Sequence, residues 1–258
     1  MRLLMRLEDG WGLAQGNYLY GRIQSEQGED EEALRLFEVS RQLFEAEEDW
    51  LGVAKNLNLM AVYQFKQHHD LQAAYRYLEQ SASLQRPLPL SSTYVETLRY
   101  LGRVQSMAEA YEAAEGCLAE AADASLQQGD MGEYSAVLYE HLLLCKKRHQ
   151  YDEALAFGYE CLENFRKLGS LRWEGLVKTQ LALLHQARQK LNEALVLFRE
   201  GLHIFHELGD LFEQAYSYYY LYRLYDEMGE TGQSLQARED ARRLNLELNN
   251  PRLAERLK

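Results

Sequence analysis

The chain of 258 residues has little proline, little cysteine and no long apolar run, and each shortage excludes a class of protein. Three prolines leave little room for linkers, so we expect one continuous domain over residues 1–258. Three cysteines are too few for a disulfide framework, and their odd number is typical of a reducing compartment. No apolar stretch of about 18 residues occurs and the N-terminus lacks a signal-peptide core, so we predict a cytoplasmic protein with no membrane partner.

Basic residues are also scarce, since 28 lysines and arginines face 40 acidic residues and the formal net charge is −12. This charge repels phosphate backbones, so we exclude nucleic acid as a partner. The chain has no glycine-rich phosphate loop, no nucleophile elbow and no HExxH motif. The pairs His68–His69 and His203–His206 each supply two metal ligands where a site needs three or four. We therefore predict no catalytic residue, no metal site and no cofactor.

A repeat is the strongest pattern that the sequence does contain. A small residue returns about every 40 positions in similar phrases, at Ala33, Ala73, Ala113, Ala154, Ala194 and Ser234. A period of this length is typical of a solenoid, in which each unit buries its apolar face against its neighbours. The predicted repeats are 11–49, 50–89, 90–129, 130–169, 170–209 and 210–249. Residues 1–10 read as the end of a preceding helix, and 250–258 as a capping or truncated helix.

Each repeat contains a second recurring position, which predicts two helices per repeat. It lies near the middle of the first helix, at Gly21, Ala61, Leu101, Leu142, Ala182 and Tyr222. Apolar residues surround these positions at a period near 3.6, as at Leu57, Ala61 and Phe65, and no strand pattern competes. The sequence therefore predicts an all-α protein.

The corners between repeats carry helix stop and start signals. Gly129–Asp130, Gly169–Ser170 and Gly209–Asp210 each offer a glycine that ends one helix and a side-chain oxygen that caps the next. Asn250 and Pro251 continue the series, because proline fits the first position of a helix. We expect another helix to begin there.

The paired helices, their small residues and these corners resemble tetratricopeptide repeats of the 40-residue type. The pattern is similar to arrays in bacterial regulators and polarity adaptors. The resemblance implies a right-handed superhelical solenoid of about six antiparallel helix pairs plus a C-terminal helix. It also implies a concave groove lined by the first helix of each repeat.

Residues on the first helices that do not face the partner helix are candidates for contact with a ligand. Tyrosine and arginine are favoured interface anchors, and an asparagine amide can hold a peptide backbone through its donor and its acceptor. Arginine can also hold a carboxylate through two hydrogen bonds. The candidates are Tyr18, Arg22, Lys55, Asn58, Arg99, Tyr139, Gln186, Tyr216, Tyr219 and Arg223.

Two functions fit this surface. The first is a non-catalytic scaffold that binds a protein or peptide in the groove. The alternative is the ligand-sensing or peptide-sensing module of a bacterial regulator that carries an output domain. Association of two copies through an end repeat is compatible with either function.

Overall fold

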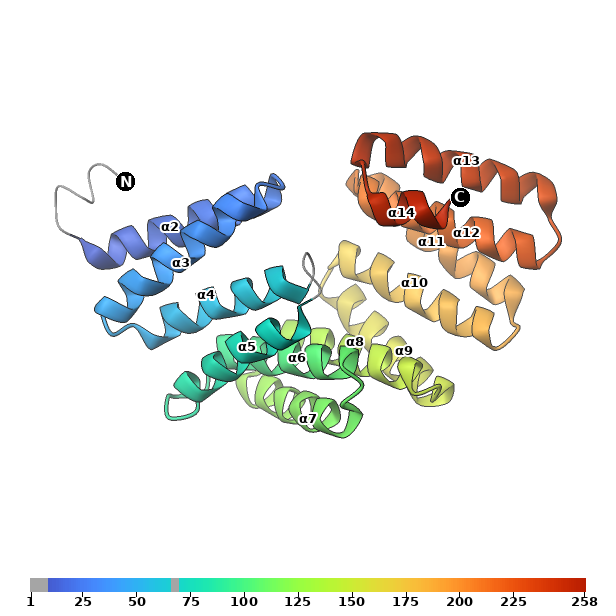
Figure 1. The fold of residues 1–258 in the computed structure, drawn as a ribbon. Coiled ribbons are helices and arrows are strands. Elements are labelled where there is room, and N and C mark those ends of the chain that lie inside the picture. The colour runs from blue at the N-terminus through green and yellow to red at the C-terminus, as the bar shows by residue number, and fades with distance from the viewer. Residues whose placement is uncertain (1–8, 66–69) are drawn as a thin grey trace. The chain divides into compact units, whose positions relative to one another are not determined.

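The described part of the chain consists of helices joined by short turns, with no strand in residues 9–65 and 70–258 (Figure 1). These are the residues that the computed structural model describes. The helices are α2 (Gly10–Glu26), α3 (Asp30–Ala46), α4 (Trp50–Tyr63), α5 (Leu71–Gln85), α6 (Ser92–Met107), α7 (Tyr111–Gln128), α8 (Met131–Lys147), α9 (Tyr151–Lys167), α10 (Leu171–Ala187), α11 (Leu191–Leu208), α12 (Leu211–Glu227), α13 (Thr231–Leu248) and α14 (Pro251–Arg256).

Helices that follow one another in the sequence pack as pairs. Contacts join α2 to α3, α4 to α5, α6 to α7, α10 to α11 and α12 to α13. The remaining pair, fourth along the chain, is α8 with α9, where His141 stacks on Phe157 at 4.9 Å between ring centroids. The predicted all-α solenoid of six helix pairs with a C-terminal helix is confirmed. We call the even-numbered helices α2 to α12 first helices and their partners second helices.

The contacts divide the chain into two compact units, and the boundary falls inside α8. Unit 1 is Met1–Glu140 and unit 2 is His141–Lys258. That the whole chain forms one array remains a prediction. The predicted end of an earlier helix falls mainly on residues 1–8, which lie outside the described part of the chain. Among the helices described, none carries an apolar stretch of membrane-spanning length.

Each helix pair approaches most closely at a small residue. In unit 1, the hydroxyl of Ser40 on α3 donates to the carbonyl oxygen of Ala14 on α2 at 2.8 Å. In unit 2, a Cβ added to Gly201 on α11 would lie 3.3 Å from the carbonyl oxygen of Gly175 on α10. A large side chain at either place would hold the two backbones apart.

The small residue of the second helix lies one position later than predicted in repeats two and three. Ala74 and Ala114 are fully buried, whereas Ala73 is half-buried and Ala113 is exposed. Each site contains two adjacent alanines, so composition alone did not separate the two registers. The small residues named from the sequence have one interval of 41 residues, from Ala113 to Ala154, and the buried ones have it from Ala33 to Ala74.

Most turns contain one residue in the left-handed region. Gly129 and Gly209 have φ values of 68° and 65°, as the predicted corners require. Glu109 and Gln189 adopt the same conformation without being glycine, with φ values of 62° and 61°. A residue with a Cβ pays about 1 kcal/mol for this backbone conformation.

Three of the predicted caps form and one does not. The side chain of Asp130 accepts from the amide of Glu133 at 3.0 Å. The side chain of Asp210 accepts from the amide of Glu213 at 3.1 Å, and that of Asn250 accepts from the amide of Leu253 at 3.0 Å. Ser170 makes no side-chain cap bond, which differs from our prediction. Serine length is not the reason, because Ser91 caps α6 by accepting from the amide of Tyr94 at 3.2 Å.

Candidate functional site

Arginine guanidinium groups lie over aromatic rings on the first helices of unit 1. Arg22 lies 6.0 Å from the ring centroid of Tyr18 within α2. On α6, Arg99 lies 4.6 Å from the ring of Tyr100. Arg103 of α6 lies 5.6 Å from the ring centroid of Phe65, which follows the end of α4. We call these three arginines and their rings the arginine row.

Two carboxylates from the following first helix, α8, complete this row. Arg99 pairs with Glu133 at 3.3 Å, and Arg103 pairs with Glu140 at 3.2 Å. Burial raises the pKa of Glu133 above its usual range, and the positive charge of Arg99 partly offsets that rise. Arg22 is exposed and 35% of the Arg103 side chain is exposed, whereas Arg99 is buried. Within the row, Arg22 and Arg103 therefore keep N–H donors that a ligand can reach.

Sequence reasoning found only part of the arginine row. It proposed Arg22 and Arg99 but missed Arg103, Tyr100 and Glu133. The spacing of Arg99 and Arg103, four residues apart on one helix, was the available signal. Contact with a ring or carboxylate on another helix cannot be read from spacing within one helix.

Asn58 lies inside the helix stack, where only 1% of the residue is exposed. Its amide oxygen accepts from the hydroxyl of Thr97 at 3.0 Å, and its amide nitrogen lies 3.5 Å from the carbonyl oxygen of Thr93. Both ends of the amide are therefore engaged within the protein. This corrects the expectation that Asn58 offers its amide to a peptide backbone.

The other predicted residues of unit 1 divide into exposed and buried ones. Arg22 and Lys55 are exposed and stand on α2 and α4. Arg99 and Tyr139 are buried, at 6% and 8% exposure. Arg22 and Lys55 can meet a ligand directly, whereas Arg99 acts through the ring and carboxylate that surround it.

In unit 2 the predicted residues are engaged with neighbouring side chains. Gln186 donates from Nε2 to Oε2 of Glu227 at 2.7 Å. Tyr219 is 8% exposed, and its hydroxyl accepts from Arg223 at 3.3 Å. Tyr216 packs its ring against Phe212 and Tyr220, at centroid distances of 4.9 and 6.4 Å. These tyrosines form a continuous aromatic surface on α12.

Lys146 is a half-buried cation of unit 2 with a neutral partner. It stands on α8, and its ammonium donates to Oε1 of Gln180 on α10 at 2.6 Å. Burial lowers the pKa of Lys146 to about 8. A neutral amide oxygen thus holds a group that is charged at neutral pH.

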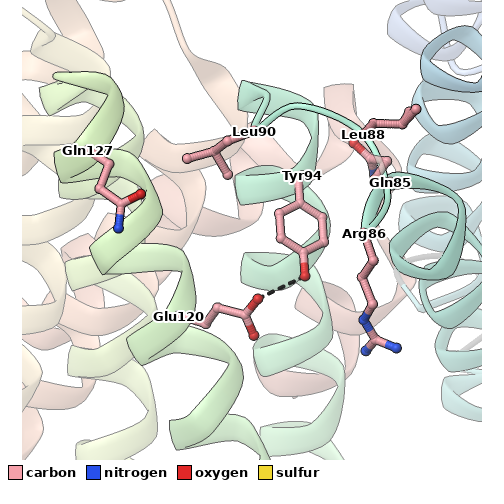
Figure 2. A pocket seen from close by; sticks show the side chains of 7 residues that line it. All are labelled: Gln85, Arg86, Leu88, Leu90, Tyr94, Glu120 and Gln127. Atoms are coloured by element: carbon pink, nitrogen blue, oxygen red, sulfur yellow. Dashed lines mark hydrogen bonds between the residues drawn. The ribbon is translucent and has the colours of Figure 1, made fainter.

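A hollow of about 440 Å³ opens in unit 1 where α5, α6 and α7 meet (Figure 2). Its lining residues are Gln85, Arg86, Leu88, Leu90, Tyr94, Glu120 and Gln127. The hydroxyl of Tyr94 donates to Glu120 at 2.8 Å, and Arg86 lies on the other side of that hydroxyl (Figure 2). Arg86 and Glu120 are both exposed to water, which weakens their attraction for any small charged group.

The residues weighed for metal or thiol chemistry serve other contacts. His206 Nε2 lies 3.1 Å from the hydroxyl of Tyr218, and His203 lies 3.5 Å from Glu207. The pair His68–His69 lies outside the described residues. Within the described ranges, no three His, Cys, Asp or Glu side chains converge as a metal site would require. Burial raises the pKa of Cys161 to about 12, which keeps its thiol protonated.

Solved structures of other proteins share this architecture. A signal-transduction ATPase with numerous domains from Pyrococcus horikoshii, which carries a tetratricopeptide repeat sensor, matches with a TM-score of 0.73 and 19% identity. The match covers 93% of this chain and 35% of that one. The chain has a tetratricopeptide-like repeat fold.

Other proteins share this tetratricopeptide-like fold. BtubC from P. vanneervenii matches with a TM-score of 0.67 and 14% identity, over 92% of both chains. The Rap conjugation gene regulator of plasmid pLS20, solved in complex with the Phr* peptide, matches with a TM-score of 0.72 and 14% identity, over 96% of this chain and 78% of that one. No protein-family model and no curated sequence matches the chain. At these identities the likeness shows the fold alone.

Proposed function

We propose that the chain is a non-catalytic scaffold that binds a protein or peptide along its first helices, with the arginine row of unit 1 as the main contact. The observation that carries the proposal is the repetition of one device on this face. Arg22, Arg99 and Arg103 each lie within about 6 Å of a ring centroid. Arginine stacked on a ring is ordered before binding, so less side-chain entropy is lost when a partner arrives.

The chemistry of this row favours a peptide with acidic side chains. A guanidinium stacked on a ring can bind a carboxylate through its edge, as Arg99 and Arg103 do with Glu133 and Glu140. Lys55 adds an exposed ammonium on α4 between the arginines of α2 and α6. The chain as a whole is acidic, and three arginines and Lys55 against Glu133 and Glu140 leave a local positive excess that would orient a partner.

Solved structures support binding of a peptide by this kind of helical repeat. The Rap regulator of pLS20 was solved with a peptide, and another Rap protein was solved with competence and sporulation factor. The small and odd number of cysteines, three, supports the cytoplasmic location that we propose. We also propose that residues 1–258 form one continuous array.

The test begins with a displayed library of random 12-residue peptides selected on the full chain. The tightest selected peptide is then measured by calorimetry against the wild type and the double variant Arg22→Ala, Arg103→Ala. We expect at least tenfold weaker binding by the variant. The control is Arg35→Ala, Arg76→Ala, which removes the same charge from exposed positions on second helices. Equal loss in both double variants would contradict the proposal, because it would reduce the effect to net charge.

The alternative function is the sensing module of a regulator, and two of the matched proteins favour it. One carries a tetratricopeptide repeat sensor and one is a gene regulator. The selected peptide separates the two functions. A sensor should change its radius of gyration on binding, as measured by X-ray scattering, whereas a pre-organised scaffold should move by less than about 1 Å.

A further inference from the structure

The loop of residues 86–91 between α5 and α6 forms one wall of the hollow in unit 1. It contains Pro87 and Pro89, whose rings fix φ and leave the loop few conformations. The amide of Leu88 also donates to the carbonyl oxygen of Gln85, the last residue of α5, at 2.9 Å. The wall is therefore ordered before a ligand arrives, which lowers the entropy cost of binding.

The side chain of Gln85 fixes this hollow to the helices behind it. The residue is 3% exposed, and its Nε2 donates to the hydroxyl of Thr97 at 2.9 Å. Its Oε1 accepts from the hydroxyl of Ser91 at 3.2 Å. An amide bonded at both ends keeps its position, so the hollow does not close by rotation of this side chain.

Two opposite charges lie on either side of one hydroxyl in the hollow. Tyr94 of α6 donates to Glu120 of α7 at 2.8 Å, and Arg86 lies on the other side of the hydroxyl (Figure 2). Burial and the bond to Glu120 raise the pKa of Tyr94, and the charge of Arg86 partly offsets that rise. Both charged groups are exposed, so each keeps hydrogen-bonding atoms that a ligand can reach.

Leucines give the same hollow an apolar side. Leu90 is 41% exposed and Leu88 is half-buried. An apolar group that covers them removes hydrocarbon surface from water, which stabilises a complex. The volume of about 440 Å³ lies within the range of small-molecule sites, about 300–1,000 Å³.

The arrangement of charge selects the kind of ligand. An exposed charge that acts singly contributes little to binding. An anion would be attracted by Arg86 and repelled by Glu120, and a cation would meet the reverse. A ligand that carries both charges on one carbon atom is attracted by both groups.

From these observations we infer that the hollow binds a free α-amino acid with an apolar side chain. The ligand carboxylate accepts from the guanidinium of Arg86. The ligand ammonium donates to the carboxylate of Glu120 and to the hydroxyl oxygen of Tyr94. The ligand side chain lies against Leu88 and Leu90. The site uses no residue of the arginine row, so it adds a small-molecule ligand to the partner proposed above.

The experiment titrates L-leucine into the isotope-labelled full chain and follows the amides by nuclear magnetic resonance. We expect the amides of Leu88, Leu90 and Glu120 to shift and to saturate at millimolar concentration. Glycine lacks the apolar side chain and should bind about tenfold more weakly. Leucinamide lacks the negative charge and N-acetyl-leucine lacks the positive charge, so each should bind about fivefold more weakly than L-leucine. Shifts that do not saturate, or equal affinities for the four compounds, would overturn the inference.

Two substitutions assign the charges to their residues. Arg86→Gln should abolish the preference for L-leucine over leucinamide. Glu120→Gln should abolish the preference over N-acetyl-leucine, and its amide oxygen can still accept from Tyr94. The controls Arg76→Gln and Glu112→Gln remove exposed charges from α5 and α7 and should leave all affinities unchanged. Equal effects of the controls would reduce the preference to net charge and contradict the assignment.

A last variant separates this site from the function proposed for unit 1. The double variant Arg22→Ala, Arg103→Ala should bind L-leucine as the wild type does, although we expect it to lose the selected peptide. Loss of L-leucine binding in this variant would place the amino acid at the arginine row and overturn its assignment to the hollow.

Discussion

The two units are built from the same kind of helix pair, but different contacts fill the space between their repeats. In unit 1 a hydroxyl network fills the space between repeats, where Thr97 bonds Asn58 at 3.0 Å and Gln85 at 2.9 Å. In unit 2 rings fill the corresponding space, with Phe198 stacked on Tyr220 at 5.7 Å between centroids. The repeat fold therefore requires a given helix spacing but not a given kind of contact. Hydrogen bonds demand particular partners, whereas apolar packing demands mainly volume.

The largest expected effect tests the apolar side of this comparison. Phe198 is 0% exposed, so Phe198→Ala removes a full ring from the core of unit 2. We expect a loss of about 3–5 kcal/mol in the free energy of unfolding, measured by urea titration. Val196 is 55% exposed on the same helix, and Val196→Ala should cost less than about 0.5 kcal/mol. Similar losses for the two variants would show that unit 2 does not rest on ring packing.

The next effect tests the hydroxyl network of unit 1. Thr97→Val keeps the shape of the side chain but leaves Asn58 and Gln85 each short of a buried hydrogen bond. The free energy of unfolding should fall by about 1–3 kcal/mol. Thr97→Ser retains the hydroxyl and should recover most of that loss. If valine and serine behave alike, the network contributes through volume rather than through hydrogen bonds.

Lys146 is one of the polar side chains within unit 2, and its lowered pKa gives a pH-dependent test. Because burial lowers its pKa from 10.5 to about 8, the unfolded chain binds more protons between these values and stability rises with pH there. Lys146→Met should raise the free energy of unfolding by about 1–2 kcal/mol at pH 7. That gain should shrink above pH 8 and vanish near the ordinary lysine pKa.

The control for Lys146→Met is Lys190→Met at an exposed position. It should change the free energy of unfolding by less than about 0.5 kcal/mol at any of these pH values. A gain for Lys146→Met that stays constant from pH 7 to pH 10 would contradict a cost of burying the charge.

The smallest expected effect tests whether the serine–carbonyl contact between the paired helices of unit 1 can also form in unit 2. Gly201→Ser places a hydroxyl next to the carbonyl of Gly175, as Ser40 already does beside Ala14. We expect a change within about 0.5 kcal/mol, because better helix propensity offsets a tight contact. Gly201→Val should cost about 1–3 kcal/mol by overpacking. Thermal unfolding of both variants measures the difference.

The repeat architecture was predictable because it depends on features of the chain that repeat. Glycines spaced by the repeat length marked corners such as Gly129 and Gly209, and both adopt the left-handed conformation. The turns at Glu109 and Gln189 carry no such mark, because tertiary packing imposes the conformation there. The register at Ala73 and Ala74 was ambiguous for the same reason, since only neighbouring helices decide which alanine is buried.

The candidate site was less predictable than the fold. Helical spacing placed Arg22, Asn58 and Arg99 on first helices. It gave no information on the residues that face them across a repeat, and those neighbours engage Asn58 fully and pair Arg99 with Glu133. Contacts between repeats join residues more than 30 positions apart, which a pattern within one helix does not encode.

The hydroxyl network of unit 1 also bears on how repeats of one architecture stack in the proper order. One apolar helix pair can stack on another in many registers with little penalty. A misplaced repeat in unit 1 would bury Thr97, Ser81 and Gln85 without their partners, and each unpaired group would cost about 1–3 kcal/mol. Only the native arrangement of α4, α5 and α6 therefore satisfies these hydrogen bonds. In a chain built from similar repeats, such specific hydrogen bonds favour one stacking order over the others.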